Sequence, residues 1–261
     1  MIVEETASQN VASDFGEGCA LVVGGGGILG TGICHAFVRS GVPVALTYFS
    51  NQASADAVQA EVERQGVEAS SSRLDLRDSD EIQQVLADAH AHFGRIHTVV
   101  YSAGPKFTPE FFSRTPVTTW RDWLDTDVLG CIQLAQASLP YLRDSHGSLV
   151  TLSTYQNDRI AVRGSPSSIA KAALDRMVVA IAKEEGKYGV RANSVRAGWI
   201  GEKAQRMLEQ VPEIAQTKLK DIPLGRLGYT EEIADTVVFL ASRRAGYITG
   251  VNLTVDGGVT L

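Results

Sequence analysis

The sequence predicts an α/β fold in which helices cover both faces of a doubly wound parallel sheet. Short runs of β-branched residues alternate along the chain with longer stretches whose apolar residues recur every three or four positions. Such alternation is typical of a parallel sheet. The 261 residues contain no low-complexity linker and no repeat, so a single domain is expected.

Seven runs follow the strand pattern, and five stretches follow the helix pattern. The predicted strands are residues 20–23, 44–48, 71–74, 98–101, 148–152, 192–195 and 252–255. The predicted helices are residues 53–64, 80–93, 120–143, 166–188 and 230–242. Ligands of such sheets bind beyond the carboxyl ends of the strands. Motifs that follow a predicted strand are therefore candidates for a functional site.

Composition narrows the class of protein. Hydrophobic residues make up 44% and charged residues 21% of the chain, as in soluble globular proteins. The net charge of −6 does not favour nucleic acid or an anionic membrane as a partner. Residues 1–17 are acidic and lack the basic start and apolar centre of a signal peptide. We expect a flexible leader over 1–17, a domain over 18–261 and a cytoplasmic location.

Neither cysteine nor histidine spacing predicts a metal site. Cys19, Cys34 and Cys131 are widely separated and form no metal-type pair, so buried thiols in a reducing compartment are expected. His90 and His92 lie two positions apart and would face different sides of a helix, which does not suit zinc.

A glycine-rich turn follows the first predicted strand. Gly25, Gly27 and Gly30 have the G-x-G-x-x-G spacing of a dinucleotide-binding fingerprint. A backbone without Cβ atoms can approach a pyrophosphate, and a helix N-terminus supplies N–H groups and partial positive charge. The turn over 24–30 therefore predicts a Rossmann-type nucleotide site, with a tight turn that binds nothing as the alternative.

The end of the second strand bears on the choice of nucleotide. An acid about 20 residues after the glycine turn would bind the ribose 2′-hydroxyl of NAD. Here the stretch 47–51 reads TYFSN, and no acid appears before Asp56. The group that would repel a 2′-phosphate is missing, although no Arg or Lys replaces it in this stretch. We expect NADP(H) in preference to NAD(H), with Ser50 and Asn51 among the cofactor-binding residues.

From about Gly18 to the C-terminus the sequence resembles the short-chain dehydrogenase/reductase family. The ending, PLGRLGYTEEIADTVVFLAS followed by YITGVNLTVDGG, matches that family closely and implies its fold rather than an activity. Ile28 stands where the family usually has glycine, and YSAG at 101–104 replaces Asn-Asn-Ala-Gly. The cofactor-binding residues that the resemblance implies are Gly24, Gly27, Ile28, Leu29, Gly30, Asp75, Leu76, Ser102, Ala103, Gly104, Lys171, Gly198 and Ile200.

The stretch GSPSSIAKAAL at 164–174 concerns catalysis. Ser167 lies four residues before Lys171, so both side chains face one side of the predicted helix, and Pro166 suits its first turn. In the family, the lysine binds the nicotinamide ribose and lowers the pKa of a tyrosine four residues earlier, whose place Ser167 takes. A serine hydroxyl is a poor general acid near neutral pH. The resemblance also implies that Thr154 stands at the position of the family's substrate-binding serine and that Asp127 stands at the position of its catalytic asparagine.

Three interpretations remain open. PSSIAK together with Asp127 resembles the 2,4-dienoyl-CoA reductases of this family, in which reduction of a conjugated C=C bond passes through an enolate. Thr154, Ser167 and Lys171 would then donate hydrogen bonds to the enolate, and Asp127 would orient or deprotonate a water. Tyr155 is either a substitute acid or a packed ring. The other interpretations are a catalytically silent subunit beside an active paralogue and a dinucleotide-binding sensor.

Other features concern the substrate and partners. The amphipathic stretch 203–220 is expected to cover a medium-sized apolar or acyl substrate or to pack as a lid, and Glu202 puts a carboxylate near the cofactor. Arg163 and Arg196 flank the cleft, either to meet an acidic substrate group or as solvated surface residues. The predicted helices 120–143 and 166–188 correspond to those that family members pack across a two-fold axis. We expect a homotetramer or a hetero-oligomer with a related subunit.

Overall fold

The computed structural model describes residues 14–201 and 219–261. In this part of the chain a seven-stranded sheet has the order β3-β2-β1-β4-β5-β6-β7, and all its pairings are parallel. The strands are β1 (Cys19–Val23), β2 (Val44–Tyr48), β3 (Ala69–Arg73), β4 (Ile96–Tyr101), β5 (Ser148–Thr154), β6 (Arg191–Ala197) and β7 (Asn252–Val255). The predicted α/β class is confirmed. The strand order reverses between β1 and β4, which is where ligands of such sheets bind.

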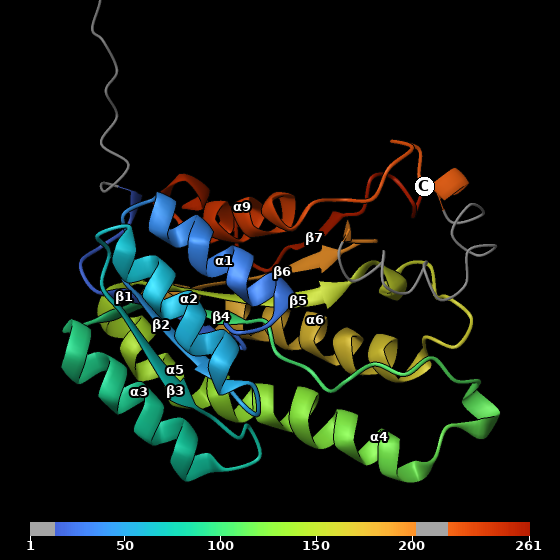
Figure 1. The fold of residues 1–261 in the computed structure, drawn as a ribbon, viewed down its shortest axis with the longest axis horizontal. Coiled ribbons are helices and arrows are strands. Elements are labelled where there is room, and N and C mark those ends of the chain that lie inside the picture. The colour runs from blue at the N-terminus through green and yellow to red at the C-terminus, as the bar shows by residue number, and fades with distance from the viewer. Residues whose placement is uncertain (1–13, 202–218) are drawn as a thin grey trace, which may run out of the picture.

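Helices cover both faces of the sheet (Figure 1). One layer consists of α1 (Ile28–Arg39), α2 (Gln52–Arg64) and α9 (Thr230–Ala241), and the other of α3 (Ser79–Phe93), α5 (Gly130–Ser145) and α6 (Ser165–Glu185). Each layer has its own apolar core because neighbouring strand residues point to opposite faces. In β1, Ala20 and Val22 join the core with α1, whereas Leu21 and Val23 join the core with α3.

The predicted helix over 120–143 consists of three pieces. These are α4 (Val117–Trp123), a π-helical turn η3 (Leu124–Leu129) and α5. The extra residue in each π-helical hydrogen-bonded ring turns Asp127 into the protein, where its side chain is fully buried. Such π turns occur frequently at functional sites. Short 3-10 turns occupy η2 (Phe112–Arg114), η4 (Tyr155–Asn157), η5 (Gly186–Tyr188) and η6 (Arg243–Ala245).

The central strands are longer than the sequence predicts. β5 and β6 pair in register as far as Thr154 and Ala197, two residues beyond the expected end of each strand. This extension places Thr154 and Arg196 within the sheet rather than in loops. At these ends β5 is paired on one side, by β6, whereas β6 is paired on both sides, by β5 and β7.

The packed region begins before the predicted start of the domain. Phe15 is only 7% exposed and packs against the rings of Phe37 and His97, at centroid distances of 5.7 and 5.4 Å, so packing begins three residues before position 18. Glu202 and most of the predicted cover over 203–220 lie outside the described residues. No helix among the described residues is long and apolar enough to cross a membrane.

Candidate active site

Two adjoining cavities open at the carboxyl ends of the strands. The first, about 610 Å³, is lined by the glycine turn, the end of β2 and the segment after β3. The second, about 410 Å³, lies over the ends of β5 and β6 and the start of α6. The two share Gly27 and the segment from Ser102 to Pro105. A ligand with two ends, such as a dinucleotide, fits this arrangement.

The glycine turn brings the start of α1 to both cavities. Gly24 has a positive φ of 80°, and a Cβ at this position would lie 3.0 Å from the Ala103 nitrogen. The first-turn residues Ile28 and Leu29 line the second cavity, where N–H groups of a first turn lack intrahelical partners. Such groups suit a pyrophosphate. Gly30 lines neither cavity: a Cβ there would lie 2.1 Å from the Gly24 oxygen, so this glycine allows α1 to pack on the turn.

The other predicted cofactor-binding residues lie along the two cavities. Ser50, Asn51, Asp75 and Leu76 line the first; Gly198, Ile200 and Lys171 line the second; and Ser102, Ala103 and Gly104 line both. Asn51 caps α2 by accepting a hydrogen bond from the Ser54 N–H at 3.2 Å. The hydroxyl of Ser54 donates to the Gly26 carbonyl at 2.8 Å. This contact fixes the start of α2 against the glycine turn.

A buried polar cluster lies at the wall of the second cavity. Asp127 Oδ1 accepts hydrogen bonds from Lys171 Nζ at 2.9 Å and from the Tyr101 hydroxyl at 2.7 Å. Lys171 Nζ also donates to the Ala103 carbonyl at 3.2 Å. Burial, reinforced by the Asp127 carboxylate, raises the pKa of Tyr101 well above its usual value. The phenol therefore stays protonated and acts as a donor.

Lys171 alone brings this cluster to the cavity. Asp127 and Tyr101 are both fully buried, and neither lines the cavity, whereas the sequence hypothesis had Asp127 meeting a cavity water directly. The second carboxylate oxygen, Oδ2 of Asp127, is buried and has no hydrogen-bond partner among the described residues. Gly104, which also lines the cavity, lies beside the pair: a Cβ on it would lie 3.4 Å from Asp127 Oδ1 and 3.7 Å from Lys171 Nζ.

Two hydroxyl groups accompany the lysine. Ser167, one turn before Lys171 on α6, lines the second cavity, and its hydroxyl has no hydrogen-bond partner among the described residues. Thr154 lines the same cavity and accepts a hydrogen bond from the Gln156 N–H at 3.3 Å, which leaves its own proton to donate. Both hydroxyls can therefore serve a ligand.

Tyr155 also lines the second cavity but is held as a packed ring. It is 6% exposed, clusters with Ile222 and Val259, and lies 6.4 Å from the Trp199 ring. Burial raises the pKa of Tyr155, which makes its phenol a weaker proton donor. The geometry favours the packed-ring alternative for this residue.

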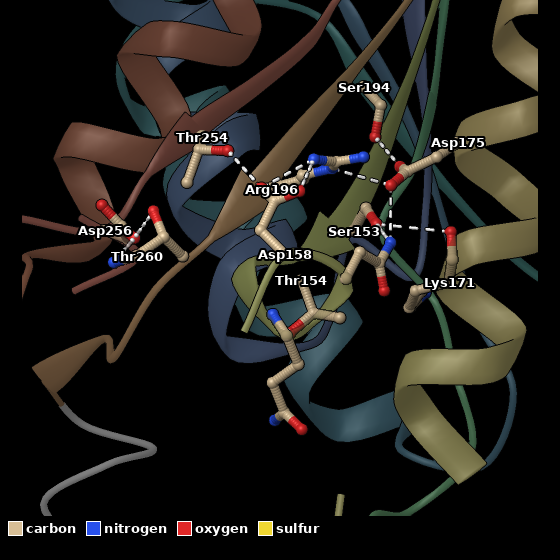
Figure 2. A network of polar contacts seen from close by, with 12 residues as sticks. Ser153, Thr154, Asp158, Lys171, Asp175, Ser194, Arg196, Thr254, Asp256 and Thr260 are labelled. Carbon is tan, nitrogen blue, oxygen red and sulfur yellow. Dashed lines mark hydrogen bonds and ion pairs between the residues drawn. The ribbon is translucent and has the colours of Figure 1, made fainter. Parts of the chain in front are cut away.

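Asp175, one turn after Lys171, centres a second network (Figure 2). It accepts hydrogen bonds from Arg196 Nε at 2.8 Å, from the Ser194 hydroxyl at 2.9 Å and from Asn157 Nδ2 at 2.5 Å. Arg196 Nη1 also contacts both carboxylate oxygens of Asp158 at 2.7 Å. The network ties α6 to β6 and to the turn after β5, and so fixes Thr154 relative to Lys171.

The two flanking arginines differ from their predicted roles. Arg196 is neither solvated nor directed at a substrate, because its side chain is 17% exposed and paired with two carboxylates. Arg163 does not line either cavity; its guanidinium lies 4.4 Å from the centroid of the Phe111 ring, and its backbone has a positive φ of 68°. The contact joins the loop after β5 to the loop after β4.

Comparisons with known proteins agree with this geometry. A family model described as enoyl-(acyl carrier protein) reductase matches residues 26–260. Over 245 residues the chain is 29% identical to the 3-oxoacyl-(acyl-carrier-protein) reductase FabG of Staphylococcus aureus (strain Mu50), covering 92% of this chain and 97% of that protein. It is 31% identical over 246 residues to the L-fucose dehydrogenase of Bos taurus, covering 92% of this chain and 88% of that protein. The chain belongs to the short-chain dehydrogenase/reductase family.

A solved structure agrees with the family assignment. A double mutant of a Serratia marcescens short-chain dehydrogenase/reductase is similar with a TM-score of 0.88 and 26% identity, over 95% of this chain and all of that one. Membership of the short-chain dehydrogenase/reductase family supports an oxidoreductase that uses a nicotinamide dinucleotide. The glycine turn at the start of α1 and the paired cavities fit such a group.

Sequence reasoning missed Tyr101 as a functional candidate. The segment YSAG drew attention to its last three residues as cofactor-binding, whereas the structure brings the Tyr101 phenol to Asp127. A large polar side chain at the end of a fully buried strand was the only available signal. Its partner lies 26 positions away, so spacing along the chain could not identify the contact.

We predict that Asp175→Ala lowers the free energy of unfolding by about 3–5 kcal/mol, because it leaves Arg196 and two neutral donors without their buried acceptor. Asp235→Ala is the matched control, since Asp235 pairs with Arg39 on the surface and should contribute less than about 1 kcal/mol. Urea denaturation measures both. Equal losses in the two variants would contradict the structural role of the network.

Proposed function

We propose that this family member is an NADP(H)-dependent reductase with non-standard catalytic residues. It acts in the cytoplasm on the C=C or C=O bond of an acyl or other medium-sized apolar substrate. The observation that carries the proposal is the buried Lys171–Asp127 pair at the cavity wall, one helical turn from Ser167. Acyl-carrier-protein substrates appear in the names of the matched family model and of FabG, and they support an acyl substrate.

The donors at the second cavity suit a developing oxyanion. When bound, the nicotinamide supplies a hydride to the substrate. Lys171 Nζ and the hydroxyls of Thr154 and Ser167 then donate hydrogen bonds to the substrate oxygen on which negative charge gathers. Preorganised donors of this kind stabilise an enolate or an alkoxide. For a conjugated C=C bond the proton at carbon comes from an ordered water, so a tyrosine is not needed.

Asp127 acts through Lys171 in this proposal. The carboxylate fixes the position of the ammonium, and Tyr101 fixes the carboxylate. A water that donates to the unpartnered Oδ2 would satisfy that buried atom. The Asp127–Lys171 pair can then pass a proton between this water and the lysine. The absence of a Cβ on Gly104 leaves the pair close to the cavity.

One observation favours the alternative of a catalytically silent subunit or a dinucleotide-binding sensor. The hydroxyl four residues before Lys171 belongs to Ser167, and a serine is a poor proton donor near neutral pH. Under this alternative the cavities would bind the dinucleotide without turning over a substrate. The two functions differ in one result: only the enzyme oxidises NADPH when an electrophilic substrate is present.

We predict that the protein oxidises NADPH with 2-enoyl or 2,4-dienoyl thioesters, followed by absorbance, and that Lys171→Ala lowers kcat/KM by about a hundred-fold or more. The loss follows from removing the charged donor that lines the cavity. Lys183→Ala is the control, because Lys183 is exposed on the same helix and should leave the rate unchanged.

Restoring the usual side chain provides a second arm of this test. Ser167→Tyr should reduce activity on C=C substrates, because the larger ring fills the cavity beside Lys171. A gain of ketone reduction in this variant would instead indicate a lapsed carbonyl reductase. If the wild-type protein binds NADPH but oxidises it with none of these substrates, the silent-subunit or sensor alternative replaces the enzyme.

The oligomer is part of the proposal. Apolar side chains are exposed along α4, η3 and the start of α6, including Val117 at 67%, Leu124 at 43%, Leu129 at 50% and Ile169 at 46% exposure. These are the helices that the sequence associates with packing across a two-fold axis. A self-complementary contact between two copies would bury this surface. We therefore favour a homotetramer or a hetero-oligomer with a related subunit.

Light scattering at micromolar concentration should give a tetrameric mass for the purified chain, or a mixed assembly once a related subunit is added. Leu129→Arg should reduce the mass, because it places a charge in the apolar surface that the subunits would bury. A monomeric mass for the wild-type protein, with and without the related subunit, would contradict the proposed assembly.

A further inference from the structure

Phe49, the first residue after β2, has two arginines beside its ring. It is 53% exposed and lines the first cavity. The guanidinium carbons of Arg73 and Arg77 lie 5.6 and 5.5 Å from the centroid of its ring. Arg73 ends β3, where it pairs in register with Tyr48, and Arg77 follows shortly after. The fold thus brings two cations to the end of β2, although residues 44–51 contain no Arg or Lys.

Neighbouring acids hold both arginines in place. Asp75 accepts hydrogen bonds from Arg77 Nε at 2.9 Å and Nη2 at 2.6 Å, and this contact lowers the pKa of the Asp75 carboxyl. Glu81 accepts from Arg73 Nη1 at 2.6 Å and from the Asp75 N–H at 2.8 Å. A guanidinium has five N–H donors. No described residue accepts a hydrogen bond from Arg77 Nη1 or from Arg73 Nε and Nη2. These groups can therefore bind a ligand.

The chemistry of this end of the cavity suits a phosphate. The residue after β2 is where an acid would bind the ribose 2′-hydroxyl of NAD, and here that residue is Phe49. Asp75 is the only carboxylate among the described residues that line the first cavity, and Arg77 neutralises it. Guanidinium groups bind phosphate oxygens through strong charge-assisted hydrogen bonds. Arg77 lines the first cavity, and Arg73 lies beside the Phe49 ring that also lines it. A dianionic group at the ribose 2′ position would meet these two cations.

We propose that Arg73 and Arg77, beside the Phe49 ring, bind the 2′-phosphate of NADP(H) and set the preference for NADP(H) over NAD(H). The assignment rests on the proposed function, which supplies the dinucleotide. The end of β2 contains no basic residue. Arg73 at the end of β3 and Arg77 in the segment after β3 take this role instead. Cation–π contacts with the Phe49 ring help to hold both guanidiniums at this end of the cavity.

Binding measurements on the whole chain test the inference without a substrate. Isothermal titration gives Kd for NADPH and NADH, and for 2′,5′-ADP and 5′-AMP as probes of the first cavity alone. The wild-type protein should bind NADPH at least about ten-fold more tightly than NADH, and 2′,5′-ADP at least about ten-fold more tightly than 5′-AMP. In the Arg73→Ala/Arg77→Ala variant this ratio should fall towards one through weaker binding of the phosphorylated ligands.

The ratio is the decisive quantity, since Arg77→Ala also releases Asp75 and can change the affinity for both nucleotides. Arg95→Ala is the matched control: Arg95 is exposed, pairs with Asp144 at 3.1 Å and precedes the amino end of β4, whereas the cavity lies at the carboxyl ends of the strands, so the ratio should stay as in the wild type. An unchanged ratio in the double variant overturns the inference and leaves the proposed reductase standing. Failure of every nucleotide to bind overturns both.

Discussion

The buried ion pair between Lys171 and Asp127 is the interaction on which the candidate active site depends. Removing either charge from water costs several kcal/mol, and the pair is tolerable only when other hydrogen bonds satisfy its remaining atoms. The Tyr101 hydroxyl, which donates to Asp127 Oδ1, and the Ala103 carbonyl, which accepts from Lys171, supply two such bonds, both from the end of β4. Asp127 Oδ2 has no partner among the described residues. Helix α6, the π turn and β4 must therefore meet in one arrangement for the lysine to reach the cavity.

The same helix is fixed a second time, one turn further along. Lys171 and Asp175 lie four positions apart on one face of α6, and Asp175 binds Arg196 of β6 and Asn157 after β5. The cavity hydroxyls and the ammonium therefore belong to elements that cannot shift independently. Preorganised donors stabilise a charge that forms during a reaction without reorganising. This rigidity is what a site lacking the usual tyrosine requires, and it is the physical basis of the proposed reductase.

The fold was predictable from local patterns, whereas the polar contacts of the site were not. Strand–helix alternation and the glycine turn depend on neighbouring residues, so they predicted the seven strands and the position of the cavities. The π turn at Leu124–Leu129 changes hydrogen bonding without changing composition, and the helical pattern ran through it. The contacts of Tyr101 with Asp127 and of Arg73 with Phe49 join residues that only the assembled sheet brings together. Arg196 was misjudged for the same reason.

A double-mutant cycle at the buried pair tests this account most directly. Asp127→Asn and Lys171→Met each leave one buried charge without its partner, and each should lower the free energy of unfolding in urea at pH 7 by about 3–5 kcal/mol. The double variant removes both charges and should lose less than the sum of the two by about 2 kcal/mol or more. Losses that add to within about 0.5 kcal/mol would contradict the account, because the two charges would then be independent.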